Sequence, residues 1–178
     1  MEPTTPLTRS TEAGPVERFL ADDHVRLDAL LRRATATPDP IDRAAYAEFR
    51  AGLLKHIGME EKILFPAAQR AHGGAPLPSA AKLRLDHGAL AALLVPTPTS
   101  AIIATIRRIL AAHNPIEEGP GGVYDVCEQL VGAEAEVLLA RLRAAPEVRV
   151  NPHVDSERIM DATRRALERA GYHLDEAA

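Results

Sequence analysis

The stretch DHVRLDALL at residues 23–31 returns as DHGALAALL at residues 86–94. Each copy is followed by a second motif, HIGMEE at residues 56–61 and HNPIEE at residues 113–118. Residues four apart lie on one face of an α-helix, so each His-x-x-x-Glu pair points an imidazole and a carboxylate in the same direction. The repeated order, a single histidine and then His-x-x-x-Glu, predicts a duplicated helical hairpin.

Together the motifs predict a site for two metal ions. Four helices would converge four imidazoles and two carboxylates on one point: His24, His56, Glu60, His87, His113 and Glu117. Imidazole nitrogen binds iron, copper, zinc and nickel, while a carboxylate can bridge two cations and neutralise part of their charge. One His-x-x-x-Glu pair alone is more often a solvated pair. Its repetition within four apolar stripes favours metal binding, because burying these groups without a shared partner would be costly.

Other polar residues near the motifs are expected to matter less. Asp23 and Asp86 each precede a proposed ligand and could hydrogen-bond imidazoles. Adjacent helical residues point about 100° apart, however, so we expect both to face solvent. Glu61 and Glu118 lie one residue out of phase, where either could hydrogen-bond a ligand or replace its neighbour as ligand. Cys127 is expected to lie on the helix predicted at 123–144 and to face the hydrophobic core. The remaining histidines are expected to be solvated: His72, His153 and His173.

Composition indicates a single helical domain. The chain has 178 residues, 46% of them hydrophobic and 26% charged, as in ordinary globular proteins. Aromatic residues make up only 3% and Trp is absent, while Ala and Leu dominate and favour helix. A net charge of −4 and a pI near 6.0 argue against a nucleic-acid partner. One cysteine cannot form an intramolecular disulfide.

The beginning of the chain is polar. Residues 1–13 are rich in Pro and Thr, which predicts a flexible lead-in without the apolar core of a secretory signal. No apolar run approaches the roughly 18 residues that span a bilayer, so no membrane partner is expected. The expected location is the cytoplasm, and the sequence leaves the oligomeric state open.

Periodicity and turn residues predict an all-α fold. Short loops favour antiparallel neighbours, so the prediction is an antiparallel up-down-up-down four-helix bundle with additional C-terminal helical segments. Pro66 should kink the second helix. A following helix is predicted at 123–144, within a metal-binding domain of residues 14–145, and another at about 155–170, within an extension of residues 146–178. The four bundle helices are predicted at about 14–34, 41–71, 79–95 and 100–118.

The six proposed ligands resemble the motif of the hemerythrin-like domains, also called HHE cation-binding domains. The resemblance covers about residues 15–144. It implies a four-helix bundle with a non-haem di-iron centre of two iron ions, bridged by the two carboxylates and an oxo or hydroxo ligand; zinc or manganese are possible alternatives. Members of the family bind dioxygen, sense oxygen or iron, or handle nitric oxide and peroxide. The implied partner is a small diatomic ligand or peroxide.

Two features differ from the oxygen-carrying hemerythrins. Those carriers have a His-x-x-x-His pair on the third helix, whereas this chain has Leu83 before His87 and Ala91 after it. Their last carboxylate is an Asp five residues after its histidine, whereas here the match is Glu117 at four or Glu118 at five. With one histidine fewer, the centre should be more open and more reactive. Glu118 and Tyr124, close to the GPGG at 119–122, are candidates to reach the open position.

The expected function is a hemerythrin-like di-iron protein that binds dioxygen or a related small molecule, in sensing, storage or oxidative or nitrosative protection. One alternative is a di-iron enzyme acting on peroxide or nitric oxide. Another is a helical interaction module with a structural metal such as zinc. We also expect the metal-free protein to be acid-sensitive, because histidines in an apolar core would become charged.

Overall fold

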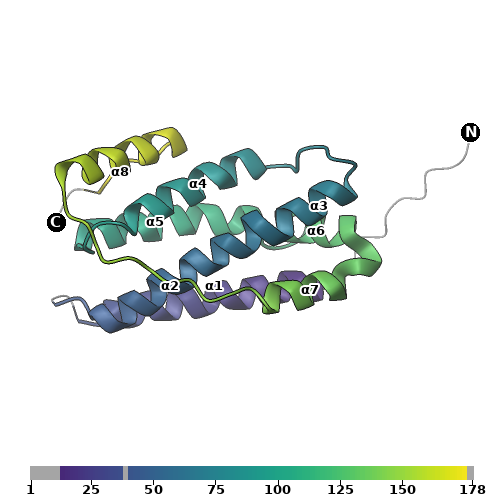
Figure 1. Cartoon of the computed structure of the whole chain (residues 1–178), viewed down its shortest axis with the longest axis horizontal. Helices are drawn as coiled ribbons and strands as arrows, with labels where there is room; N and C mark the ends of the chain where they lie inside the picture. Colours follow the sequence, from purple (N-terminus) through teal and green to yellow (C-terminus); the bar gives the residue numbers. More distant parts are fainter. Residues whose placement is uncertain (1–12, 38–39, 176–178) are drawn as a thin grey trace, which may run out of the picture.

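The computed structural model describes residues 13–37 and 40–175 (Figure 1). Every regular element in these residues is helical, which confirms the all-α prediction. Most of the predicted flexible lead-in, residues 1–12, lies outside the described residues. The α-helices are α1 Pro15–Ala34, α2 Arg43–Met59, α3 Phe65–Ala71, α4 Ala80–Leu93, α5 Ser100–Glu117, α6 Val123–Val131, α7 Ala135–Arg143 and α8 Glu157–Ala170.

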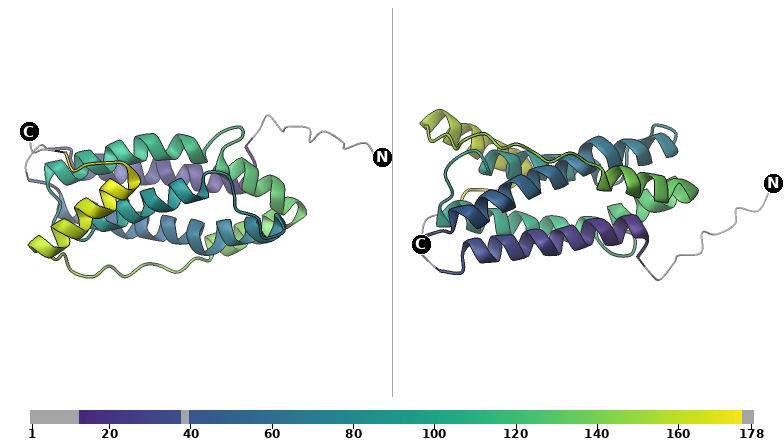
Figure 2. Two further views of the ribbon diagram at one scale, coloured as in Figure 1. Left: turned by 90° about the horizontal axis from the view of Figure 1, so that it is seen from above. Right: turned by 60° about the horizontal axis from the view of Figure 1, so that its bottom comes forward.

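Four long helices, α1, α2, α4 and α5, lie along the long axis of the molecule, and consecutive ones run in alternating directions (Figures 1 and 2). Helix α1 packs on α2, and α4 packs on α5. Helices α6 and α7 cover one end, where α6 contacts α3 and α7 contacts α1. Helix α8 returns along the outside and packs on α4.

Local signals explain where the helices begin. Pro15 occupies the first turn of α1, where its missing N–H costs nothing and its fixed φ suits the helix. The side chain of Asp42 accepts hydrogen bonds from two backbone N–H groups at the start of α2. Thr99 and Ser156 cap α5 and α8 in the same way. Each cap satisfies N–H groups that have no partner within the helix.

The second predicted helix, 41–71, is interrupted. A π-helical turn, Glu60–Leu64, separates α2 from α3. Pro66 has no backbone N–H, and its ring crowds the carbonyl one turn earlier, so it disturbs the regular α-helix before it. The helix instead widens into the π turn before the proline. This turn begins at Glu60, one of the proposed ligands. Single π turns of this kind are frequent at functional sites.

The helix predicted at 123–144 is likewise two helices. A 3₁₀ turn, Gly132–Glu134, separates α6 from α7. Gly132 has φ 51° and ψ −119°, a backbone conformation that a glycine adopts readily and a continuous α-helix cannot contain. The composition of this stretch favours helix throughout, so the sequence did not indicate the break.

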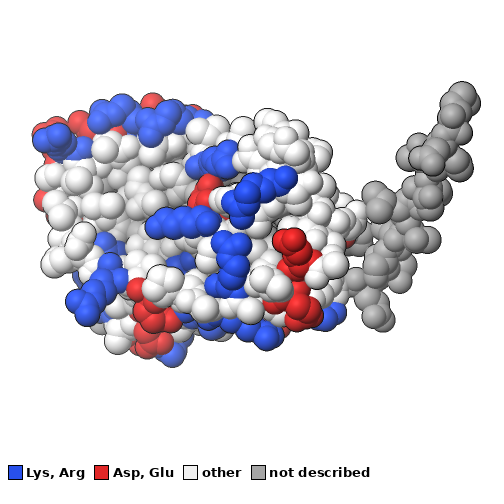
Figure 3. All heavy atoms as spheres, turned by 45° about the vertical axis from the view of Figure 1, so that its right-hand side comes forward, with Lys and Arg blue, Asp and Glu red and all other residues white. Residues whose placement is uncertain are grey.

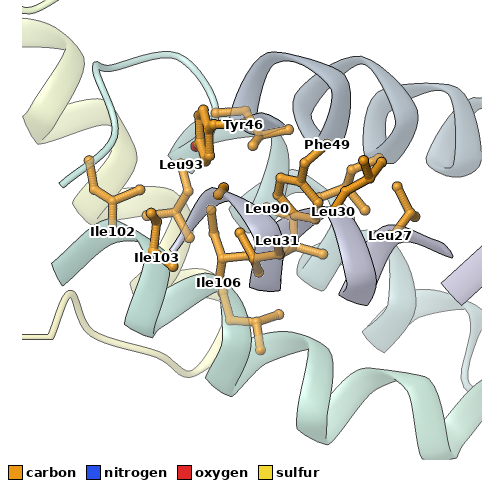
Figure 4. Close-up of a cluster of buried hydrophobic side chains, with 14 of the residues drawn as sticks. Leu27, Leu30, Leu31, Tyr46, Phe49, Leu90, Leu93, Ile102, Ile103 and Ile106 are labelled. Carbon is orange, nitrogen blue, oxygen red and sulfur yellow. The ribbon is translucent and has the colours of Figure 1, made fainter. Parts of the chain in front are cut away.

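Two clusters of apolar side chains form the core. The first, centred on Leu31, Phe49, Leu90 and Ile106, fills the space between α1, α2, α4 and α5 (Figure 4). The second lies toward α3, α6 and α7 and includes Cys127, which confirms the prediction that this residue belongs to the core. Along α1, α2 and α4 the proposed ligands lie between residues of the first cluster and residues of the second. A polar layer is therefore enclosed between two apolar ones.

The C-terminal residues contribute to this core. Leu167 of α8 is fully buried in the first cluster. His153 was expected to be solvated, but its ring packs 6.1 Å from that of Tyr46 and it is half-buried. His72 and His173 are exposed, as predicted. The division of the chain at residue 145 stays a prediction.

The surface is mixed in charge. Figure 3 shows lysine, arginine and acidic side chains interspersed with neutral ones on one face. Among the helices that the structure describes, none has the length and apolar character needed to cross a membrane.

Candidate metal centre

The polar layer consists of the six residues singled out by the repeated motif. All of them are buried: His24 and His56 come from α1 and α2, His87 from α4, His113 and Glu117 from α5, and Glu60 from the π turn. The two glutamates are 0% exposed. An ionised carboxylate is buried to this extent only when it is paired or bound to a metal.

The six side chains form two donor sets that share both glutamates. One set is His24, His56, Glu60 and Glu117, and the other is Glu60, His87, His113 and Glu117. Within each set, the four donor atoms lie within 4.8 Å of one another. We call them the His24/His56 set and the His87/His113 set.

Each shared glutamate turns one oxygen toward each set. Oε1 of Glu60 lies 3.5 Å from Nε2 of His56, and its Oε2 lies 3.1 Å from Nε2 of His87. Oε2 of Glu117 lies 3.5 Å from Nε2 of His24, and its Oε1 lies 3.1 Å from Nε2 of His113. This is the orientation that a carboxylate needs to bridge two cations. Glu117, rather than Glu118, faces the centre.

The opposite nitrogen of every ring, Nδ1, is paired with an outer carboxylate. The pairs are His24 with Glu118 at 2.5 Å, His56 with Asp23 at 2.8 Å, His87 with Glu61 at 2.8 Å and His113 with Asp86 at 3.3 Å. A carboxylate at Nδ1 holds the proton there and leaves Nε2 free to bind a metal.

These pairs correct one prediction. Asp23 and Asp86 were expected to face solvent, yet Asp86 is 0% exposed and both hydrogen-bond a histidine. The angle between adjacent helical residues does turn each aspartate away from its own neighbour. It turns the carboxylate toward the histidine of the next helix instead. The alternative that Glu61 and Glu118 hydrogen-bond a ligand is the one the structure shows.

The C-terminal segment is hydrogen-bonded, through Lys82, to one of the outer carboxylates, Asp86. Nζ of Lys82 donates a hydrogen bond to Oδ1 of Asp86 at 2.5 Å, and it also bonds the carbonyl of Ala170 and the hydroxyl of Tyr172, each at 3.2 Å. The end of α8 is thus connected through Lys82 and Asp86 to His113.

The carboxylates decide the protonation of the metal-free centre. Burial disfavours the charged form of His56, but Glu60 and Asp23 outweigh it and raise its pKa to about 10. Burial is likewise outweighed by the glutamates around His87, whose pKa rises to about 11. Burial and the neighbouring His56 lower the pKa of His24. The expectation that charging of buried histidines makes the metal-free protein acid-sensitive is therefore wrong for His56 and His87, which the carboxylates hold protonated.

Three buried atoms show that the donors fit a metal ion. Oε2 of Glu60, Oε1 of Glu117 and Nε2 of His87 make no well-aligned hydrogen bond among the described residues, although ion-pair contacts of 3.1 Å reach each of them. A buried polar atom left unsatisfied costs about 1–3 kcal/mol. All three belong to the His87/His113 set, and a cation between them would satisfy each. Nitrogen and carboxylate donors together suit iron, zinc or manganese.

Tyr124 was a candidate to reach the open position beside His87. Its hydroxyl lies instead in the His24/His56 set and is fully buried. The signal in the sequence was a tyrosine two residues after GPGG, at the start of a helix. The hydroxyl oxygen contacts Oε1 of Glu60 at 2.5 Å, Oε2 of Glu117 at 3.1 Å, and Nε2 of His24 and of His56 at 3.2 Å each.

A pocket borders the centre at His24. It lies between α1 and α5, has a volume of about 630 Å³, and His24 forms part of its wall. Leu27, Leu31 and Leu110 give it an apolar lining, and Arg107 contributes a positive charge. A molecule of a few atoms can therefore lie against His24, at the edge of the centre.

Comparison with known proteins agrees with this arrangement. Neither a search of curated proteins nor a search of solved structures found a match to this chain. A protein-family model, the hemerythrin HHE cation binding domain, matches residues 16–158. The match covers more than half of the chain and includes all six residues of the two donor sets. The chain therefore belongs to the hemerythrin HHE cation-binding domain family.

Proposed function

We propose that this protein is a non-haem di-iron protein that binds dioxygen or a related small molecule, in sensing, storage or protection against oxidative or nitrosative stress. The four long helices would act as an antiparallel four-helix bundle around the metal pair. The observation that carries the proposal is the sharing of Glu60 and Glu117 between two sets of buried donors. A cytoplasmic location is part of the proposal.

Each donor set has a role in this function. His24 and His56 would hold one ion, His87 and His113 the other, and the two glutamates would bridge them. When bound, the iron pair supplies a redox-active Lewis-acid centre with positions open to a small ligand. Zinc or manganese could occupy the same donors, so the identity of the metal is itself part of the proposal.

The residues around the centre suit the binding of a small ligand. The outer carboxylates fix the four rings, so that Nε2 of each points inward. The two apolar clusters lie on opposite sides of the polar layer and exclude bulk water from it. The pocket beside His24 would admit a molecule of the size of dioxygen, peroxide or nitric oxide to the edge of the centre.

A second candidate is a di-iron enzyme acting on peroxide or nitric oxide. The composition of α4 favours it. This helix supplies His87 and, one turn earlier, the fully buried Leu83 in place of a second histidine. The His87/His113 set therefore consists of only two histidines and the two glutamates. Such a set leaves more positions open than a site with a third histidine, and open positions favour turnover over simple storage.

Metal analysis of protein purified from its own host tests the proposal. We expect about two iron ions per chain, together with a near-ultraviolet absorption band of a bridged ferric pair. One or two zinc ions without this band would overturn the di-iron proposal and favour an interaction module with a structural metal. Consumption of peroxide or nitric oxide by the iron-loaded protein, lost in His56→Ala, would select the enzyme.

A further inference from the structure

We propose that Tyr124 is a further protein ligand of the metal centre, bound through its phenolate oxygen to the ion held by His24 and His56. This inference rests on the proposed function. The phenol oxygen lies 2.5–3.2 Å from one donor atom of each of the four residues in the His24/His56 set. These are the atoms that would surround one ion.

The surroundings of the phenol suit a cation better than a proton. A phenol has one O–H and can donate one hydrogen bond. With its proton at Nδ1 beside Glu118, the ring of His24 can only accept at Nε2. Nε2 of His56 would lose its proton when a metal binds. The two glutamate oxygens are acceptors as well. Three acceptors thus converge on the single phenol proton in the metal-free protein, whereas a metal ion beside the phenolate would satisfy all of them.

The two donor sets differ in this respect. The His24/His56 set contains the hydroxyl oxygen of Tyr124, while the His87/His113 set contains the three atoms that make no well-aligned hydrogen bond. With Tyr124 as a ligand, one ion would have five protein donors and the other four. The ions would then be inequivalent, and the ion held by His87 and His113 would have more coordination positions free of protein donors. When the metal binds Tyr124, the phenol proton is released to solvent, as for other protein ligands.

The turn between α5 and α6 places Tyr124 beside the His24/His56 set. The turn after α5 contains Gly119 and Gly121 at φ 81° and 80°, values that glycine adopts without strain. A Cβ on Gly122 would lie 2.5 Å from the carbonyl oxygen of Glu117, so that residue must also be glycine. The chain reverses against the end of α5, and Tyr124 follows in the first turn of α6, fully buried.

Spectroscopy of the ferric protein tests the assignment. A tyrosinate bound to ferric iron gives a visible charge-transfer band, and excitation in this band enhances the ring vibrations of the bound tyrosine. We expect wild-type protein loaded with ferric iron to show both signals. Tyr124→Phe should lose both while retaining iron, since it removes one oxygen and keeps the ring.

The chain offers a matched control. Tyr46 is also a fully buried tyrosine, but it lies in the first core cluster, and its hydroxyl has no hydrogen-bond partner among the described residues. Tyr46→Phe should keep the band. The third tyrosine, Tyr172, lies at the end of α8. If Tyr124→Phe does not fold, the Tyr46→Phe/Tyr172→Phe double variant decides, because any remaining tyrosinate signal must come from Tyr124.

The outcomes separate the two proposals. Iron-loaded wild-type protein without a tyrosinate signal would overturn the role of Tyr124 and leave the di-iron proposal standing. A signal that persists in Tyr124→Phe, or disappears in the double variant, would do the same. A wild-type protein that takes up no iron would overturn both.

Discussion

The carboxylate of Asp23 lies 2.8 Å from Nδ1 of His56, on the neighbouring helix, and not against its sequence neighbour His24. The same relationship continues from helix to helix and closes on itself. Each acidic residue beside a proposed ligand supports the histidine of the next long helix in chain order, and the last supports the first: Asp23 with His56, Glu61 with His87, Asp86 with His113, and Glu118 with His24. The ring joins α1, α2, α4 and α5 through hydrogen bonds at the level of the metal centre.

Replacing Asp23 with Asn should weaken metal binding at the His24/His56 set. The neutral amide no longer stabilises the proton on Nδ1 or raises the basicity of Nε2, and loss of such a partner costs about 10- to 100-fold in metal affinity. Competition with a chelator of known affinity measures this. Asp22→Asn, at the exposed preceding residue, is the control and should bind as wild type. Equal affinities in the two variants would show that the outer carboxylates do not support the ligands.

His56→Ala should lower the metal content from about two ions per chain to about one or less. His56 is one of only two histidines in its donor set, and its removal leaves one nitrogen for that ion. Elemental analysis of the purified protein gives the content. His72→Ala is the control, because His72 is exposed in the loop after α3. A full complement of two ions in His56→Ala would place the metals elsewhere.

The repeated motif was sufficient to identify which residues converge. Residues four apart on a helix share a face whatever the neighbouring helices do, so the pairing of His56 with Glu60 and of His113 with Glu117 follows from spacing alone. Burial of the ligand histidines also follows, since each lies in phase with leucines of its own helix. These inferences are local and need no knowledge of packing.

Features that depend on contact between helices could not be predicted. Asp23 was expected in solvent because its direction on α1 is known from the sequence, but the position of α2 beside it is not. The π turn at Glu60 depends on how the chain accommodates Pro66, and the break at Gly132 on where α7 must pack. The place of Tyr124 depends on the path of the GPGG turn, so the sequence indicated proximity to the centre but assigned the wrong side.

Leu167→Ala should destabilise the protein by about 2–5 kcal/mol, the usual cost of removing a buried leucine side chain. Leu167 is 0% exposed and belongs to the first core cluster, although it lies beyond the residues matched by the family model. Chemical denaturation of the metal-free protein measures the change. Leu85→Ala is a suitable control, because Leu85 is 42% exposed. A change below about 0.5 kcal/mol, the range of surface substitutions, would show that α8 does not belong to the cooperative core.

Metal-free protein should lose stability on the alkaline side. The pKa of His56 is raised from 6.5 to about 10, and that of His87 from 6.5 to about 11. A group whose pKa is raised by folding stabilises the native state fully below its unfolded value. This contribution is present below pH 6.5 and is lost as the pH rises through about 10 and 11.

The metal-loaded protein should not show this loss. Metal binding requires the neutral ring, so no histidine proton remains to be lost, and the bound ions stabilise the native state by mass action. Melting temperatures measured from pH 6.5 to pH 10, with and without a chelator, test both statements. The two curves should diverge as the pH rises. In the metal-free state, His87→Gln should flatten the decline, because it removes one of the two groups responsible. A metal-free melting temperature that stays constant over this range would mean that the carboxylates do not hold these histidines in their charged form.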